Sequence, residues 1–116
     1  MVTLTSDRPR LTSVATILEL EAGEELADVL PETGPAVVYF YRNWSEPCVV
    51  TGNRLGRVDT SVPVVAVDAD DRPTTADAYG VESVPTLVFV RDGEPVGRHV
   101  GPEEYDRLER LVEEHT

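Results

Sequence analysis

The distribution of apolar and polar positions along the chain predicts strands that alternate with helices. Three runs are apolar enough for buried strands: "SVATILELE" (13–21), "AVVYFY" (36–41) and "VPVVAVDA" (62–69). The middle run is continuous, aromatic and β-branched, which is typical of a strand covered on both faces of a parallel or mixed sheet. A fourth segment, "PTLVFVRDGEPVGRHVG" (85–101), predicts a hairpin of two strands that turns at Asp92 and Gly93.

Two helices are predicted between the first three strands. The first lies in "GEELADVLPETG", where apolar residues recur on one helical face and Pro31 and Gly34 close the segment. The second lies in "SEPCVVTGNRLGRV" (45–58), where Ser45 suits the N-cap. Gly52 and Gly56 weaken this second helix, so we expect it to be short or irregular.

Two further helices complete the pattern. "DDRPTTADAYG" predicts a short helix that ends near Gly80, and "PEEYDRLERLVEEH" predicts an amphipathic helix with Pro102 near its first position. The order is therefore β-α-β-α-β-α-β-β-α. Parallel βαβ units followed by a hairpin and a covering helix predict an α/β domain with three layers, α/β/α, around a central mixed sheet. We assign this domain to residues 14–116 and expect residues 1–13, which are polar and contain Pro9, to form a flexible tail.

The charge of the chain changes the range of partners to consider. The 116 residues carry 22 acidic side chains against 10 basic ones, all of them arginine, for a net charge of −12. Such a surface repels nucleic acid and anionic membranes, so we expect neither as a partner. The acidic residues form either a binding face for a basic partner or a halophilic adaptation to concentrated salt. Their spread over the whole chain favours the second interpretation.

The remaining composition limits the expected cellular location and the kinds of disulfide or metal site. No apolar run approaches the length that crosses a bilayer, and the first residues lack a signal-peptide core, so we expect a cytoplasmic protein, a monomer or a weak dimer. A single cysteine excludes an intramolecular disulfide and a cysteine-rich zinc site. His99 and His115 lack the spacing of metal ligands. We therefore expect no metal and no cofactor.

Three segments in order resemble the thioredoxin family: "VVYFYRNWSEPC", "VAVDADDRPTTADAYGVESVPT" and "LVFVRDGEPVGRHVG". The first is similar to the strand and motif that normally end in Trp-Cys-Gly-Pro-Cys. The second is similar to the next strand, its helix and a turn that ends in a cis-proline. The third is similar to the closing hairpin. The resemblance covers roughly residues 14 to 115 and implies the thioredoxin-like fold.

The family's chemistry needs two cysteines three residues apart. The first, a thiolate stabilised by a helix N-terminus, attacks one sulfur of a substrate disulfide, forms a mixed disulfide and releases the other sulfur as a thiolate. The second cysteine then attacks the mixed disulfide and releases the substrate. Here the first position is Ser45, whose hydroxyl has no sulfur to exchange, and Cys48 keeps the second position.

Further departures from the family pattern concern proton handling. The resemblance implies a buried Asp where this chain has Tyr39 and a Lys where it has Ala66, and Glu46 replaces the motif glycine. We expect Tyr39 and Ala66 to fill core volume. Because burial and a neighbouring carboxylate both disfavour a thiolate, we expect Cys48 to be mostly protonated and a poor nucleophile.

The resemblance also implies a binding surface that needs no cysteine. It places Trp44 beside the motif, Glu46 and Pro47 within it, and Val84, Pro85 and Gly101 opposite it. The Val84–Pro85 bond is cis in the family, and the backbone before it pairs with an extended substrate segment. Each residue also has a structural interpretation. Trp44 suits partial burial, the Pro85 turn suits folding alone, and Gly101 suits a plain turn into a helix.

Three functions stay open at this point. The first is a module that has lost dithiol–disulfide oxidoreductase activity and binds protein or peptide segments, some of them cysteine-containing. The second is a monothiol exchange protein that uses Cys48. The third is an acidic scaffold whose motif surface is vestigial. The lone thiol favours the first or the third over the second.

Overall fold

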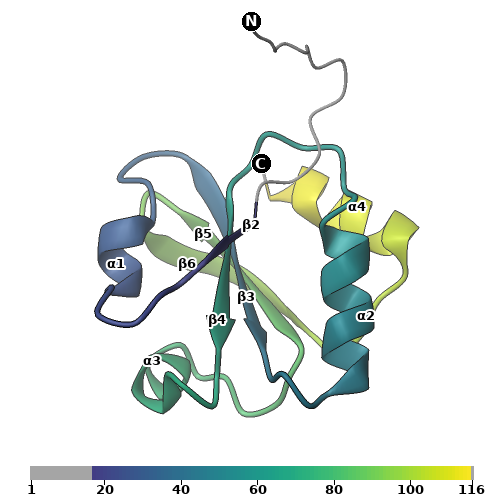
Figure 1. Cartoon of the computed structure of the whole chain (residues 1–116). Coiled ribbons are helices and arrows are strands. Elements are labelled where there is room, and N and C mark those ends of the chain that lie inside the picture. The colour runs from purple at the N-terminus through teal and green to yellow at the C-terminus, as the bar shows by residue number, and fades with distance from the viewer. Residues whose placement is uncertain (1–16, 116) are drawn as a thin grey trace, which may run out of the picture.

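The computed structural model describes residues 17–115 and builds them into one mixed sheet flanked by helices (Figure 1). The strands are β2 (Ile17–Glu19), β3 (Pro35–Tyr41), β4 (Val64–Asp68), β5 (Thr86–Arg91) and β6 (Glu94–Val100). The helices are α1 (Leu26–Val29), α2 (Glu46–Leu55), α3 (Pro73–Ala78) and α4 (Tyr105–Glu114). The predicted α/β class and element order are confirmed over this range. The predicted tail, residues 1–13, and the start of the first predicted strand lie outside it.

The strand order in the sheet is β2-β4-β3-β5-β6. β4 pairs in parallel with both β2 and β3, and β5 pairs antiparallel with β3 and β6. β3 therefore lies at the centre, which explains why its five middle residues are all buried. The continuous apolar run in the sequence is the signature of this central position.

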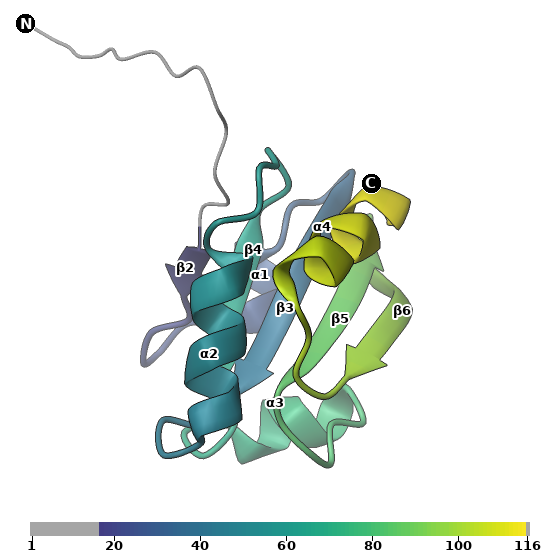
Figure 2. The ribbon, with the colours of Figure 1, turned by 90° about the vertical axis from the view of Figure 1, so that its right-hand side faces the viewer.

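Two helices cover each face of the sheet (Figure 2). α2 and α4 pack on the face that carries Val37 and Tyr39, together with Leu55 and Leu108. α1 and α3 lie on the opposite face, whose buried cluster includes Phe40. Because successive strand residues point to opposite faces, β3 supplies both cores. The core is therefore two apolar layers that share one sheet.

The hairpin turn follows the sequence prediction. Asp92 has a φ of 54° and Gly93 a φ of 81°. Two consecutive left-handed residues match the twist of the flanking strands, so an Asp-Gly pair suits this turn. The Asp92 carboxylate also accepts a hydrogen bond of 2.7 Å from the backbone N–H of Gly34, which ties the hairpin to the segment before β3.

Two helix predictions were wrong in detail. α2 is a regular helix of ten residues rather than a short or irregular one. A Cβ atom at Gly52 would lie 3.2 Å from Cε2 of Tyr39, so the missing side chain leaves room for the tyrosine ring, and this packing offsets the weak helix propensity. The last helix begins at Tyr105 rather than near Pro102, because Glu104 has an extended backbone and forms the N-cap.

Candidate functional site

Three chain segments come together at one end of the sheet. Phe40 pairs with Thr86, and Thr86 pairs with Val100. The segment after β3, the turn before β5 and the residue after β6 therefore leave neighbouring strands at the same edge. These segments carry Trp44 and Ser45, Val84 and Pro85, and Gly101; we call these five residues the motif face. The strand register thus brings together residues up to 57 positions apart in the chain.

Ser45 occupies the N-cap of α2. It is 8% exposed, and its Oγ atom accepts a hydrogen bond from the backbone N–H of Cys48 at 3.4 Å. The Ser45 carbonyl also accepts bonds from Cys48 and Val49 N–H groups, both at 3.1 Å. The hydroxyl therefore acts as a helix cap, the role that residue type and position predict.

Cys48 lies one turn into α2 and is 2% exposed. It is the chain's single cysteine and is unpaired. Its backbone carbonyl accepts a hydrogen bond from the Tyr39 hydroxyl. This thiol is thus enclosed in the first turn of the helix, as its apolar interpretation predicts.

Tyr39 does more than fill space. Its ring lies against Gly52, its hydroxyl donates to the Cys48 carbonyl, and its side chain is 4% exposed. Burial raises the pKa of Tyr39 well above its usual range, and the nearby Cys48 contributes to the shift. The hydroxyl therefore stays protonated at neutral pH and acts as a donor. Tyr39 fixes the first turn of α2 to the sheet.

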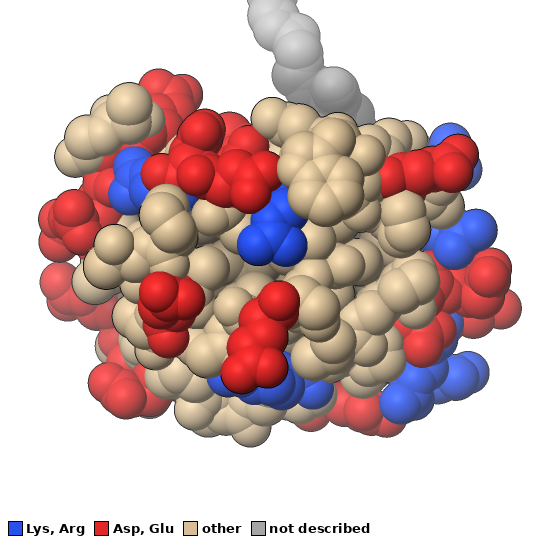
Figure 3. Space-filling view, turned by 90° about the horizontal axis from the view of Figure 1, so that it is seen from below, with Lys and Arg blue, Asp and Glu red and all other residues tan. Residues whose placement is uncertain are grey.

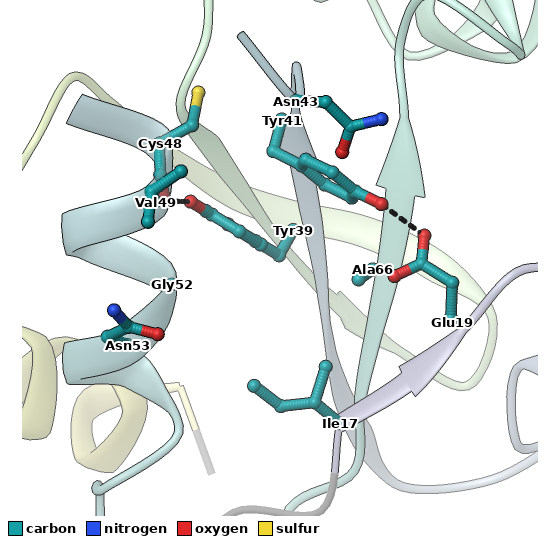
Figure 4. Close-up of a pocket in the computed structure, with 10 residues that line it drawn as sticks. All are labelled: Ile17, Glu19, Tyr39, Tyr41, Asn43, Cys48, Val49, Gly52, Asn53 and Ala66. Carbon is teal, nitrogen blue, oxygen red and sulfur yellow. Dashed lines mark hydrogen bonds between the residues drawn. The ribbon is translucent and has the colours of Figure 1, made fainter. Parts of the chain in front are cut away.

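Ala66 is buried in the core, as expected, and it also borders a hollow. The register places it between Tyr39 on β3 and Glu19 on β2, with all three on one face of the sheet. Because the alanine side chain is a single methyl group, a hollow is left above it between α2 and β2 (Figure 4). We call this hollow the α2–β2 cavity; its volume is about 240 Å³. It is lined by Ile17, Glu19, Tyr39, Tyr41, Asn43, Cys48, Val49, Gly52, Asn53 and Ala66.

Trp44 is the most exposed large side chain of the motif face, at 74%. Its Nε1 atom donates a hydrogen bond of 2.9 Å to Asp70, which also accepts one of 2.9 Å from Arg42. The alternative of a partly buried structural tryptophan does not fit this exposure. The indole is held at its edge by Asp70 while most of its surface faces solvent.

The sequence analysis did not predict that Arg42, Asp68 and Asp70 belong to this site. Asp68 accepts a hydrogen bond of 3.0 Å from the Asn43 side chain and one of 2.9 Å from the Asp70 backbone, so it anchors both loops. A signal was available, because Arg42 directly follows one predicted strand and the acidic run 68–71 follows another. Parallel strands end at the same sheet edge, which predicts that these loops meet.

The turn before β5 offers free backbone groups. The Val84–Pro85 bond is cis, Pro85 is buried, and its carbonyl accepts a hydrogen bond of 2.8 Å from the N–H of Gly101. Within residues 17–115, neither the N–H nor the carbonyl of Val84 has a hydrogen-bond partner. Gly101 has a φ of 104°, and no atom of the described residues lies within 4 Å of the position a Cβ would take, so the space beside it is open.

Charged side chains also lie at this end of the molecule. Glu46 and Pro47 are exposed in the first turn of α2, where a carboxylate interacts favourably with the helix dipole. Figure 3 shows this end of the molecule from below: residues other than Asp, Glu, Lys and Arg cover much of it, with acidic side chains and arginines on and around them. In the part of the chain that the structure describes, no group of three or more potential ligands could hold a metal ion. No helix among residues 17–115 is long and apolar enough to span a bilayer.

Comparisons with known proteins agree on one family. A family model described as Thioredoxin matches residues 17–114. A curated thioredoxin of Chlamydia caviae is 37% identical over 87 residues, which cover 72% of this chain and 85% of that protein. One of Staphylococcus epidermidis is 34% identical over 88 residues, with the same coverage. The solved structure of a mutant thioredoxin from Halobacterium salinarum has 33% identity, a TM-score of 0.80 and coverage of 92% of this chain and 96% of that one.

Proposed function

This chain belongs to the thioredoxin family, and we propose that it lacks dithiol–disulfide oxidoreductase activity and binds extended protein segments at its motif face. One observation carries the first half. The position that must supply the attacking sulfur holds Ser45, whose hydroxyl caps α2, and the chain's single thiol is 2% exposed. An oxygen at this position can neither form nor pass on a mixed disulfide.

The second half rests on the geometry of the motif face. The N–H and carbonyl of Val84, which have no hydrogen-bond partner within residues 17–115, suit the addition of one strand of a partner, as in other cases of β-augmentation. The open space at Gly101 leaves room for a partner's backbone. Exposed Trp44 supplies aromatic area of the kind that dominates binding hot spots. The proposed partners are protein or peptide segments, some containing cysteine, and neither nucleic acid nor membranes.

The catalytic half is tested by the reduction of insulin disulfides with dithiothreitol as the electron source. We expect the wild-type chain to give no turnover above the reagent alone. Ser45→Cys places a second thiol three residues before Cys48 and should give measurable turnover, whereas Ser45→Ala should not. Wild-type turnover equal to that of Ser45→Cys would contradict the proposal.

The binding half is tested with a synthetic peptide selected against the protein from a random display library. Trp44→Ala should weaken its binding by at least about 1 kcal/mol, roughly fivefold. Val96→Ala is the matched control, because Val96 is 54% exposed but lies toward the hairpin turn, at the other end of β6. Equal affinity for the wild type and Trp44→Ala would show that the motif face is not the binding site.

A second candidate function, monothiol exchange by Cys48, has one observation in its favour: Cys48 is among the residues that line the α2–β2 cavity. Alkylation of the native protein with iodoacetamide tests it. A rate close to that of a free cysteine peptide would support monothiol chemistry, and a rate that rises only on unfolding would support an inert thiol. The cytoplasmic location and the monomeric or weakly dimeric state stay predictions from the sequence.

A further inference from the structure

The α2–β2 cavity takes no part in the proposed binding of protein segments. We propose that it is a binding site for a small planar aromatic ring that carries a short ammonium side chain. This inference is independent of the proposed function, because that function uses the motif face and this one uses the hollow between α2 and β2. Size, shape and charge each support it.

The volume sets the size of the ligand. An apolar protein cavity of about 150 Å³ accommodates benzene. The α2–β2 cavity, at about 240 Å³, therefore has room for one six-membered ring and a side chain of a few atoms. Ile17 and Val49 at its rim are 37% and 51% exposed, so the cavity has an open side through which a ligand can enter.

The walls select a flat, apolar group. The rings of Tyr39 and Tyr41 are nearly parallel, with an interplanar angle of 12° and centroids 5.8 Å apart. Figure 4 shows both rings reaching across the cavity from β3, one toward α2 and one toward β2. Ala66 also lines the cavity, and the Tyr39 ring packs where Gly52 lacks a side chain. A ligand ring can extend this aromatic stack at half-buried Tyr41 and cover the exposed side chains of Ile17 and Val49.

The lining selects a cation. Apart from the tyrosine hydroxyls and the Cys48 thiol, Glu19 is the one ionisable group that lines the cavity, and no arginine among residues 17–115 does so. Tyr41 donates to Oε2 of Glu19, which leaves Oε1 without a partner in the described part of the chain. An ammonium group can pair with this oxygen and interact with the tyrosine rings. A carboxylate ligand would instead meet Glu19 and a net charge of −12.

Titration of the full chain by two-dimensional amide NMR tests the proposal, with four probes at one ionic strength. We expect 2-phenylethylammonium to bind with a Kd of about 1 mM and to shift the amides of Tyr41 and Gly52. Neutral 2-phenylethanol should bind at least about threefold more weakly, and 3-phenylpropionate and ringless butylammonium at least about tenfold more weakly. No saturable shift with about 20 mM phenylethylammonium, or equal binding of butylammonium, would overturn the proposal.

Variants locate the site. Ala66→Leu fills the cavity and should weaken phenylethylammonium binding at least about tenfold, while Val96→Leu, an enlargement outside the cavity, should not change it. Glu19→Gln should remove the preference for phenylethylammonium over phenylethanol. If Ala66→Leu does not fold, Tyr41→Leu decides, with an expected loss of at least about fivefold. Unchanged binding by a folded cavity variant would refute the site, whatever the outcome of the insulin and peptide assays.

Discussion

Replacing Tyr39 by phenylalanine should change how the stability of this protein depends on pH. The variant keeps the ring beside Gly52 but loses the hydroxyl that donates to the Cys48 carbonyl. Near pH 8, the loss of one buried hydrogen bond should lower the free energy of unfolding by about 1 kcal/mol. At this pH the tyrosine is neutral in both the folded and the unfolded chain, so titration adds nothing.

At alkaline pH the sign of the difference changes. Because burial raises the pKa of Tyr39 in the folded state, the unfolded chain loses this proton first, and stability falls as pH rises above about 10. At about pH 11 the unfolded chain has about ten ionised Tyr39 side chains for each neutral one, while Tyr39 in the folded chain is still protonated. The resulting loss of stability is RT ln(1 + 10), or ~1.4 kcal/mol. Tyr39→Phe does not suffer it. The two proteins should therefore be about equally stable near pH 11.

Urea unfolding followed by circular dichroism at several pH values, at one high ionic strength, measures this crossing. The background is favourable, because the chain has no lysine, the other side chain that ordinarily titrates close to tyrosine. Val38→Ala is the control, because Val38 is also buried but lies on the opposite face of β3. Its free energy of unfolding should depend on pH in parallel with that of the wild type. A Tyr39→Phe curve that also runs parallel to the wild type up to about pH 11 would refute the reasoning.

Three further predictions concern stability. Ser45→Ala removes the N-cap oxygen of α2 and should lower the free energy of unfolding by about 1 kcal/mol in a urea titration, with Ser45→Gly costing only a few tenths; equal effects would argue against the cap. Leu108→Ala, at a side chain with 0% exposure between α4 and the sheet, should cost about 2–5 kcal/mol, against less than ~0.5 for exposed Val96→Ala. Raising KCl from about 0.1 M to 1 M shortens the Debye length from ~10 to ~3 Å and so screens the repulsion among the charges of a chain with a net charge of −12. The melting temperature should therefore rise by at least about 4 °C. A melting temperature that stays constant or falls with KCl would contradict a self-repelling surface.

Local sequence patterns were sufficient to predict the central strand, the hairpin turn and the start of α2. The continuous run "AVVYFY" identified the central strand because a short apolar run rich in aromatic and β-branched residues is typical of a strand covered on both faces. Asp92-Gly93 identified the hairpin turn because both residues accept a left-handed backbone. Ser45 identified the start of α2 because its hydroxyl replaces a missing backbone acceptor.

The sequence missed features that depend on packing between residues far apart in the chain. Gly52 predicted a weak helix, but the Tyr39 ring, thirteen positions earlier in the chain, packs against it and supports a regular one. Ala66 is buried in the core as expected, but the sequence did not predict the hollow above it, between α2 and its register neighbours Tyr39 and Glu19. These neighbours lie outside the short sequence segments in which hydrophobic periodicity is analysed, so periodicity could not predict the contacts.

By itself, the sequence determined that the chain folds as alternating strands and helices, that an oxygen stands at the first motif position, and that one thiol is present. These are properties of residue type and short-range spacing. Only the tertiary structure decided that Trp44 is exposed and held by Asp70, that the Val84 backbone has no partner in the described part of the chain, and that a cavity opens between α2 and β2. Such features depend on which strands become neighbours, and strand pairing joins residues whose separation in the chain carries no local signal.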